Sequence, residues 1–203
     1  MRVRTVEGEG VDRVNAISDG VFAIVLTLLV LQFEVPDVPA ADLWPALRAM
    51  RPLVVSYLLT FSVVGLYWVV HHNLFDRVVR HDRVLLYLNL LFLLTVSFLP
   101  FPTELVGVYG TRLAWTLYAV NFAVIGLLMT CIWAYAARRA FLAAEVGERT
   151  ARLVTLRSLI SPAVFLVSIA VSLVNLDAAY LTPLLIVPLQ ALWVRRYGRP
   201  SRP

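Results

Sequence analysis

The stretch RVNAISDGVFAIVLTLLVL, residues 13–31, decides the fold because it is a nearly continuous apolar run. About 20 predominantly apolar residues are enough to cross the hydrocarbon core of a bilayer as a helix. The rest of the chain has the same character, since 60% of its 203 residues are hydrophobic and its mean hydropathy is +0.79. A soluble domain is usually about 45–50% apolar. The sequence therefore predicts an all-α membrane protein embedded in a lipid bilayer.

Six apolar stretches take up most of the chain. The predicted spans are residues 13–33, 52–72, 84–103, 112–137, 154–174 and 179–194. They leave no room for a soluble domain, so residues 1–203 are expected to form a single unit of six transmembrane helices. A polar stretch precedes the first span and no small-residue cleavage site follows it, which argues against a signal peptide.

The arginines predict the orientation of these spans. All 18 basic residues are Arg, and all but Arg48, Arg51 and Arg112 fall at the chain ends or in loops on one side. The arginines nearest the ends are Arg2, Arg4, Arg199 and Arg202. Because arginine-rich loops stay in the cytoplasm, both termini are predicted to be cytoplasmic in the cell inner (plasma) membrane. The same rule explains the net charge of +5, so no nucleic-acid partner is expected.

Other functional motifs are weak or missing. VGVYG at residues 106–110 is similar to the TVGYG filter of potassium channels, but the extra Val108 would shift the carbonyl register. The stretch also falls between two predicted spans, which favours a Gly-rich turn. The single Cys131 lies inside a span, and the chain has no CxxC or HExxH motif. No metal site, cofactor or enzyme activity is therefore expected.

The first span has two faces when its residues are placed at about 100° each. One stripe holds Arg13, Ile17, Gly20, Ile24, Leu28 and Leu31. Asp19 lies about 140° away from Ile24, so it should point toward helices of its own bundle. Spacing alone favours lipid contact or packing for the stripe. It leaves Ser18 and Asp19 equally as a helix cap or as members of a buried polar network.

Four motifs together resemble the transmembrane protein 175 family, which are potassium-permeable channels of bacteria and of endosomes and lysosomes. They are RVNAISDG at 13–20, YWVVHHNLF at 67–75, LNLL at 88–91 and PFP at 100–102. The family pattern in the first helix is Arg-x-x-x-Phe-Ser-Asp, and this chain carries Ile17 in place of the Phe. That replacement is conservative and leaves the polar residues of the motif intact.

The resemblance implies a homotetramer whose pore is lined by the first helix of each of four subunits. By position, the family's apolar constriction would be Ile24, with Leu28 and Leu31 outward of it. The family's Thr that is linked to selectivity matches Thr27. A ring of apolar side chains lowers hydration and can gate by dewetting. Because potassium is weakly hydrated, it should lose the least hydration energy on entering such a ring. It would be held only transiently in the pore.

Polar and ionisable residues gather near the cytoplasmic ends of the first three spans. They are Arg13, Ser18, Asp19, Trp68, His71, His72 and Asn89. Inside hydrocarbon such groups need partners, and the resemblance also implies a shared structural network that ties the first helix to its neighbours. If one histidine of the pair faces the cytoplasm instead, His72 is favoured as the buried one.

Three functions remain open at this point. The leading hypothesis is a passive, potassium-preferring cation channel. The alternative is a secondary transporter, with proton coupling through Asp19 and the histidine pair as one form of it. Transporters usually show inverted repeats and broken helices at the midplane. Neither an internal repeat nor a mid-span acidic residue is present here, which disfavours coupling. A non-conducting assembly factor would rest only on the apolar stripe.

Overall fold

The computed structural model describes residues 6–7 and 9–197, so Arg2, Arg4, Arg199 and Arg202 lie outside the described residues. Within the described chain, six helical segments are long and apolar enough to cross a membrane. They are Val11–Gln32, Arg51–Phe75, Arg83–Tyr109, Arg112–Arg138, Glu148–Val174 and Leu176–Tyr197. These segments overlap the six stretches expected from hydropathy. The largest differences are at the end of the third, which runs on to Tyr109, and at the start of the fifth, which begins at Glu148.

Of the first three spans, one is an uninterrupted α-helix, one ends in a 3-10 turn and one is divided into two helices. Helix α1 (Glu9–Leu28) continues as the 3-10 turn η1 (Leu29–Gln32), and α3 (Arg51–Phe75) is a single long helix. The third span is divided into α4 (Arg83–Ser97) and α5 (Pro100–Tyr109). The break falls where Pro100 opens α5, because proline has no amide hydrogen to donate and is tolerated in a first helical turn.

The last three spans follow the same scheme. Helix α6 (Arg112–Arg138) is uninterrupted, whereas the fifth and sixth spans are divided near Pro162 and Pro183. Their parts are α7 (Glu148–Ser158), α8 (Ile160–Val174), α9 (Leu176–Leu181), η3 (Thr182–Leu185) and α10 (Ile186–Tyr197). The remaining elements are η2 (Ala40–Asp42), α2 (Leu43–Ala49) and the strands β1 (Val6–Glu7) and β2 (Arg80–His81), which pair antiparallel.

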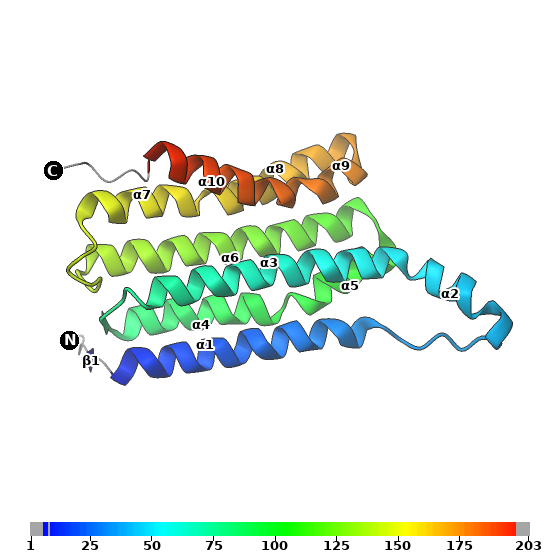
Figure 1. Ribbon diagram of the computed structural model, residues 1–203, viewed down its shortest axis with the longest axis horizontal. Helices are drawn as coiled ribbons and strands as arrows, with labels where there is room; N and C mark the ends of the chain where they lie inside the picture. Colours follow the sequence, from blue (N-terminus) through cyan, green and yellow to red (C-terminus); the bar gives the residue numbers. More distant parts are fainter. Residues whose placement is uncertain (1–5, 8, 198–203) are drawn as a thin grey trace.

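Helix α6 occupies the centre of the bundle and packs against α4, α5, α7 and α8. Its aromatic residues form the core, with Tyr118 and Phe122 4.8 Å apart between ring centroids and Phe122 stacked 4.7 Å from Phe165 of α8. Trp115 is fully buried beside them. Figure 1 shows α1 at one edge of the bundle and α10 near the opposite edge. Helix α1 therefore lies away from the central helix and packs mainly against α3 and α4.

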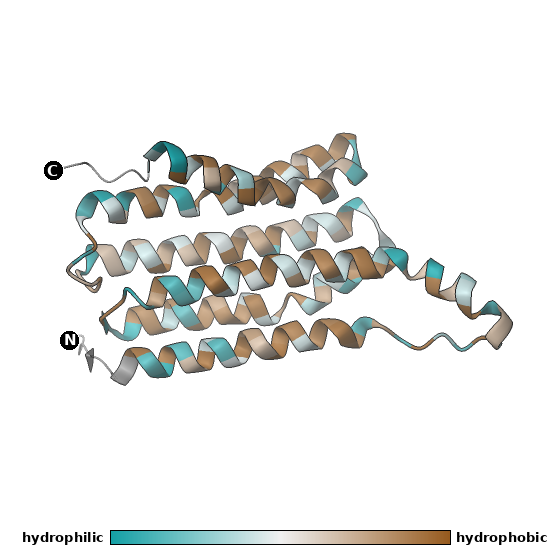
Figure 2. Cartoon of the chain, in the orientation of Figure 1, coloured by the Kyte–Doolittle hydropathy of each residue, from teal (hydrophilic) through white to brown (hydrophobic). Residues whose placement is uncertain are grey.

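The two ends of the described chain lie at the same end of the bundle. Helix α1 begins there and α10 ends there, together with the connections from α3 to α4 and from α6 to α7 (Figure 1). Hydrophilic residues are concentrated toward the ends of the helices and in the segment that includes α2, and apolar residues dominate between them (Figure 2). This banding is the pattern expected of helices that cross a membrane.

The VGVYG stretch is helical, so the prediction of a Gly-rich turn is wrong for Val106–Tyr109. These four residues form the last turn of α5, and Gly110 ends the helix in the left-handed conformation with φ 55°. Gly110 donates its amide hydrogen to the Val106 carbonyl over 3.1 Å. The helix continues because Val106 is buried against its neighbours. A helical turn does not have the loop conformation in which the TVGYG filter presents its carbonyls.

Candidate functional site

Helix α1 buries one face and leaves the other open. The buried side chains of its described part are Val11, Val14, Ser18, Phe22 and Val25, followed by Leu29 in η1. They recur every three or four residues, which is the spacing of a single helical face. The opposite face is exposed in the isolated subunit: Ile24 is 59% exposed and Leu31 is 71% exposed. The structure thus places Ile24, Leu28 and Leu31 on one open stripe of α1.

Small residues run along one edge of this stripe, and Gly20 belongs to both. Ala16, Gly20, Ala23 and Thr27 are all exposed, and a Cβ atom added at Gly20 would meet nothing within 4 Å. The Thr27 hydroxyl donates to the Ile24 carbonyl over 2.8 Å. Its proton is therefore used within the helix, and its oxygen lone pairs remain open toward the exposed side.

A buried, hydrogen-bonded cluster of polar side chains joins α1 to α3 and α4. The Ser18 hydroxyl donates to the Val14 carbonyl over 2.8 Å, and the Asn89 amide nitrogen donates to Ser18 Oγ over 3.1 Å. The remaining oxygen of Asn89 lies 2.9 Å from Nε2 of His71. Because that oxygen can only accept, His71 must carry a proton on Nε2. Ser18, Asn89 and His71 thus form one connected cluster across three helices.

Aromatic rings enclose His71. Its ring stacks on Phe75 at 4.5 Å and on Phe92 at 5.2 Å between centroids, and Phe22 of α1 lies 5.8 Å away. The histidine is 1% exposed. A ring held on both faces and hydrogen-bonded at its edge has little freedom to rotate, so this histidine fixes the packing of α1 on its neighbours.

A second, more exposed set of contacts lies beside the cluster of Ser18, Asn89 and His71. Trp68 donates its indole hydrogen to Asp19 Oδ1 over 2.8 Å, and the Trp68 ring stacks on His72 at 6.0 Å. His72 lies 3.5 Å from Asp76, and about half of its side chain is exposed. The preference for His72 as the buried histidine is therefore wrong, and His71 takes that place. Adjacent helical residues differ by about 100° in direction, so only one of the pair can face α4.

Arg13 lies apart from both sets. It is exposed on the open side of α1, and no hydrogen bond or ion pair joins it to Asp19 among the described residues. The expectation that Arg13 belongs to the polar network is not met in the subunit. The reason is its direction, because Arg13 falls within about 20° of Ile24 on the helix.

Comparisons with known proteins agree with this arrangement. The sequence profile described as endosomal/lysosomal potassium channel TMEM175 matches residues 13–100. A potassium channel of Chamaesiphon minutus is 35% identical over 171 residues, which cover 80% of this chain and 84% of the relative. The chain belongs to the TMEM175 family. Another relative, a potassium channel of Streptomyces collinus, is 39% identical over 127 residues, and the match covers 60% of this chain but only 62% of that relative's length.

A solved structure of the family has the same fold. The crystal structure of a lysosomal potassium-selective channel TMEM175 homolog from Chamaesiphon minutus superposes with a TM-score of 0.79 at 30% identity. The superposition covers 95% of this chain and 100% of that one. The six-helix fold expected from hydropathy is thus that of the TMEM175 family.

Sequence reasoning missed the contact that holds the C-terminal end of the first span, at η1, in this TMEM175 family member. Gln32 of η1 donates from Nε2 to the Pro100 carbonyl over 2.8 Å, at the break between α4 and α5. A glutamine at the end of the first span was the available signal, because a polar side chain within a span needs a partner. The bond fixes the position of the chain next to Leu31.

Sequence reasoning also missed two interior polar contacts of the bundle. The Thr60 hydroxyl lies 3.1 Å from both Thr103 Oγ1 and the Tyr118 hydroxyl. Tyr67 and Ser161 share a hydrogen bond of 2.7 Å. Polar residues within spans need partners, so these residues carried a signal, but the sequence alone does not say which helix faces which.

Replacing Asn89 with Leu should destabilise the subunit. The substitution leaves the Nε2 hydrogen of buried His71 unpaired, and an unsatisfied buried donor costs about 1–3 kcal/mol. Thermal unfolding in detergent should show a lower midpoint for Asn89→Leu. Asn73→Leu is the matched control, because Asn73 is exposed and, among the described residues, its side chain bonds only to the Val69 carbonyl of its own helix. Equal midpoints for the two variants would contradict a stabilising role for the cluster of Ser18, Asn89 and His71.

Proposed function

We propose that this chain is a subunit of a potassium-preferring cation channel, and that four subunits surround a pore lined by the open face of α1. The observation that carries the proposal is the apolar stripe of Ile24, Leu28 and Leu31, which is turned away from the subunit's own bundle. We place the channel in the plasma membrane with both termini in the cytoplasm, in keeping with its arginine distribution. The names of the bacterial relatives support potassium as the permeant ion.

The small residues beside the stripe favour close packing of one α1 against another. Helices in membranes associate through small residues because their backbones can then approach each other. Ala16, Gly20, Ala23 and Thr27 supply such a line. If neighbouring α1 helices meet along it, the adjacent apolar stripe is directed toward the common axis. Lipid contact alone gives no reason for small and large residues to be separated in this way.

The proposed mechanism depends on dehydration and on pore width. No charged side chain lies on the stripe of described residues between Arg13 and Leu31. An apolar ring at Ile24 would close the pore by dewetting and would pass ions only when slightly wider. A weakly hydrated cation such as potassium then meets the lowest barrier. Thr27 supplies the oxygen atoms nearest to the proposed Ile24 ring.

The transporter alternative finds less support in the geometry. Proton coupling would need a titratable group that exchanges protons with both sides of the membrane. His71 is enclosed by aromatic rings and bonded to Asn89, and Asp19 accepts a hydrogen bond from Trp68. These contacts give both groups a structural role, so neither needs a role in proton coupling to explain its presence.

Flux measurements on the purified protein in liposomes test the proposal. An outward potassium gradient should drive ion flux that rises with the gradient, and planar bilayers should show unitary current steps. Liposomes without protein give the background. Flux that saturates as exchange does, without current steps, would favour the transporter. No flux at all would favour the assembly factor.

The assembly should be a homotetramer. One α1 helix cannot enclose a pore, so several copies must meet around it. We expect the detergent-extracted protein to have four times the 22.8 kDa mass of the chain, measured by native mass spectrometry or by light scattering with correction for detergent. A stable monomer or dimer under conditions that preserve flux would contradict this assembly.

Thr27→Val should lower the preference for potassium while conduction persists. Valine is close to threonine in size but lacks the oxygen that faces the exposed side, and the Ile24 carbonyl loses the hydroxyl that it now accepts from. Reversal potentials in mixed potassium and sodium solutions measure the change. Thr116→Val is the matched control, because Thr116 makes the same kind of bond within α6, far from α1. An unchanged reversal potential in Thr27→Val would remove Thr27 from the selectivity mechanism.

A further inference from the structure

Two adjacent cavities, which share four lining residues, lie between α3, α6, α7, α8 and α10, away from α1. The larger, of about 140 Å³, opens at the arginine-rich end of the bundle and is lined by Arg77 and Arg157 together with polar and apolar residues. The smaller, of about 30 Å³, continues toward Tyr67 and Ser161. Val70, Met129, Ser158 and Gln190 line both. The two cavities therefore form one groove that leads from the end of the bundle toward its middle.

The wide end of this groove carries uncompensated positive charge. Arg77 is exposed and Arg157 is half-buried. None of the described residues that line the cavity is acidic, and neither arginine has an ion pair with a described carboxylate. The backbone at Arg77 is fixed, because its carbonyl accepts a hydrogen bond of 2.8 Å from the Ala143 amide. Two arginines that line one cavity without a carboxylate in its described lining favour an anion, and guanidinium matches the geometry of phosphate well.

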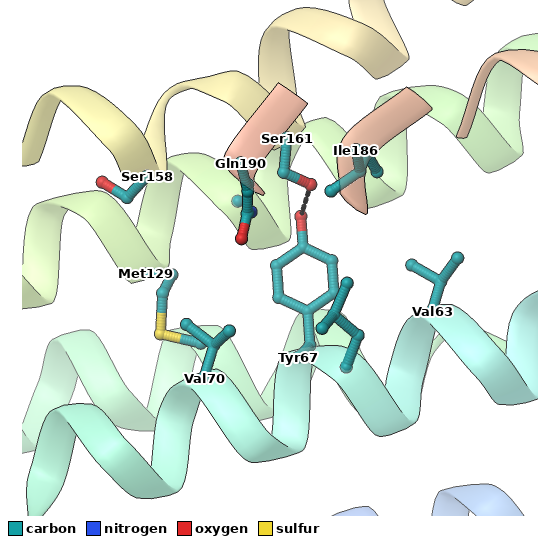
Figure 3. Close-up of a pocket in the computed structure, with 10 residues that line it drawn as sticks. Val63, Tyr67, Val70, Met129, Ser158, Ser161, Ile186 and Gln190 are labelled. Atoms are coloured by element: carbon teal, nitrogen blue, oxygen red, sulfur yellow. Dashed lines mark hydrogen bonds between the residues drawn. The ribbon is translucent and has the colours of Figure 1, made fainter. Parts of the chain in front are cut away.

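The narrow end of the groove is lined mainly by apolar side chains, and the Tyr67 and Ser161 hydroxyls there bond to each other. Figure 3 shows Val70 and Met129 on one side of the Tyr67–Ser161 hydrogen bond, and Ile186 and Val63 on the other side. Gln190 reaches into the same space from α10 (Figure 3). Such a surface suits hydrocarbon better than water. The groove thus has a cationic mouth and an apolar continuation, in the order in which a phospholipid presents its headgroup and chain.

We propose that this groove binds the headgroup phosphate of an anionic phospholipid between Arg77 and Arg157, with the first part of an acyl chain along Val70 and Met129. Basic pockets between transmembrane helices on the cytoplasmic side bind anionic headgroups, and the cavity of about 140 Å³ has room for a group the size of several water molecules of about 30 Å³ each. This inference does not depend on the proposed channel function, because lipid binding can be measured without ion flux.

The test compares lipids on the purified, delipidated full-length protein in detergent. Phosphatidylglycerol and phosphatidylcholine with the same acyl chains are titrated, and bound lipid is counted by native mass spectrometry. We expect phosphatidylglycerol to bind more tightly. The double variant Arg77→Gln/Arg157→Gln should lose about tenfold or more in affinity, since each arginine near an anionic headgroup contributes about 1 kcal/mol. Arg195→Gln/Arg196→Gln, which removes equal charge from exposed positions, should lose less than about twofold.

A second variant keeps the proposal testable if the arginine variants fold poorly. Val70→Trp fills the groove while both arginines remain, and it should also weaken phosphatidylglycerol binding. Equal losses in the two double variants, or full binding by Val70→Trp, would overturn the site. Inorganic phosphate alone is the last arm. If it displaces phosphatidylglycerol at comparable concentration, the site binds a free anion and the lipid assignment fails.

Discussion

Ile24→Asn is expected to raise single-channel conductance and to weaken the discrimination of potassium from sodium. Ile24 lies on the open stripe of α1 at 59% exposure, and the proposed ring of four isoleucines would exclude water. An amide in each position wets the ring, so ions cross with more of their hydration shell. A barrier lowered by about 1.4 kcal/mol corresponds to about tenfold in rate. Planar bilayer recordings give both conductance and reversal potential.

Leu31→Asn is the control for this variant. Leu31 shares the stripe but lies in the 3-10 turn η1 at the C-terminal end of the first span, where we expect the proposed pore to be wider and its ions to be better hydrated. The same substitution should therefore change conductance and selectivity much less than it does at Ile24. If Ile24→Asn conducts and selects like the parent protein, the apolar ring is absent here and the pore must be sought on another helix.

Hydropathy was sufficient for the six-helix fold but not for the ends of its helices. Apolar runs decide which segments enter a membrane, so the spans could be found without a template. The third span was predicted to end near residue 103, but α5 continues to Tyr109. Pro100 and Pro102 suggest an end in the sequence, whereas the burial of Thr103 and Val106 against neighbouring helices extends the segment.

The rotation of α1 could be predicted in part because helical periodicity is a local property. Asp19 was expected about 140° from Ile24, and in the structure it faces Trp68 of α3. The choice between His71 and His72 could not be made in this way. That choice depends on the contact between His71 of α3 and Asn89 of α4. Residue spacing within one helix does not predict a contact between two helices.

Gly107→Ala is expected to destabilise the subunit although alanine is the better helix former. A Cβ atom at this position would lie 2.6 Å from Leu53 Cδ1, 2.7 Å from Ser56 Oγ and 2.9 Å from Leu53 Cα. The last of these is a backbone atom, so α5 and α3 would have to move apart. Overpacking of this kind costs about 1–3 kcal/mol. The thermal midpoint in detergent should fall by several degrees.

Gly65→Ala provides the matched comparison because it makes the same substitution within α3. A Cβ atom at Gly65 meets nothing within 4 Å, so only helix propensity changes, and alanine should stabilise by up to about 1 kcal/mol. The two variants should therefore shift the midpoint in opposite directions. The difference between the two midpoints therefore measures the effect of the close packing of α5 on α3. The same packing positions the Pro100 carbonyl that accepts the hydrogen bond from Gln32 of η1. Gly107→Ala should accordingly alter gating as well as stability. A midpoint equal to that of Gly65→Ala would mean that the two helices are not closely packed at this point.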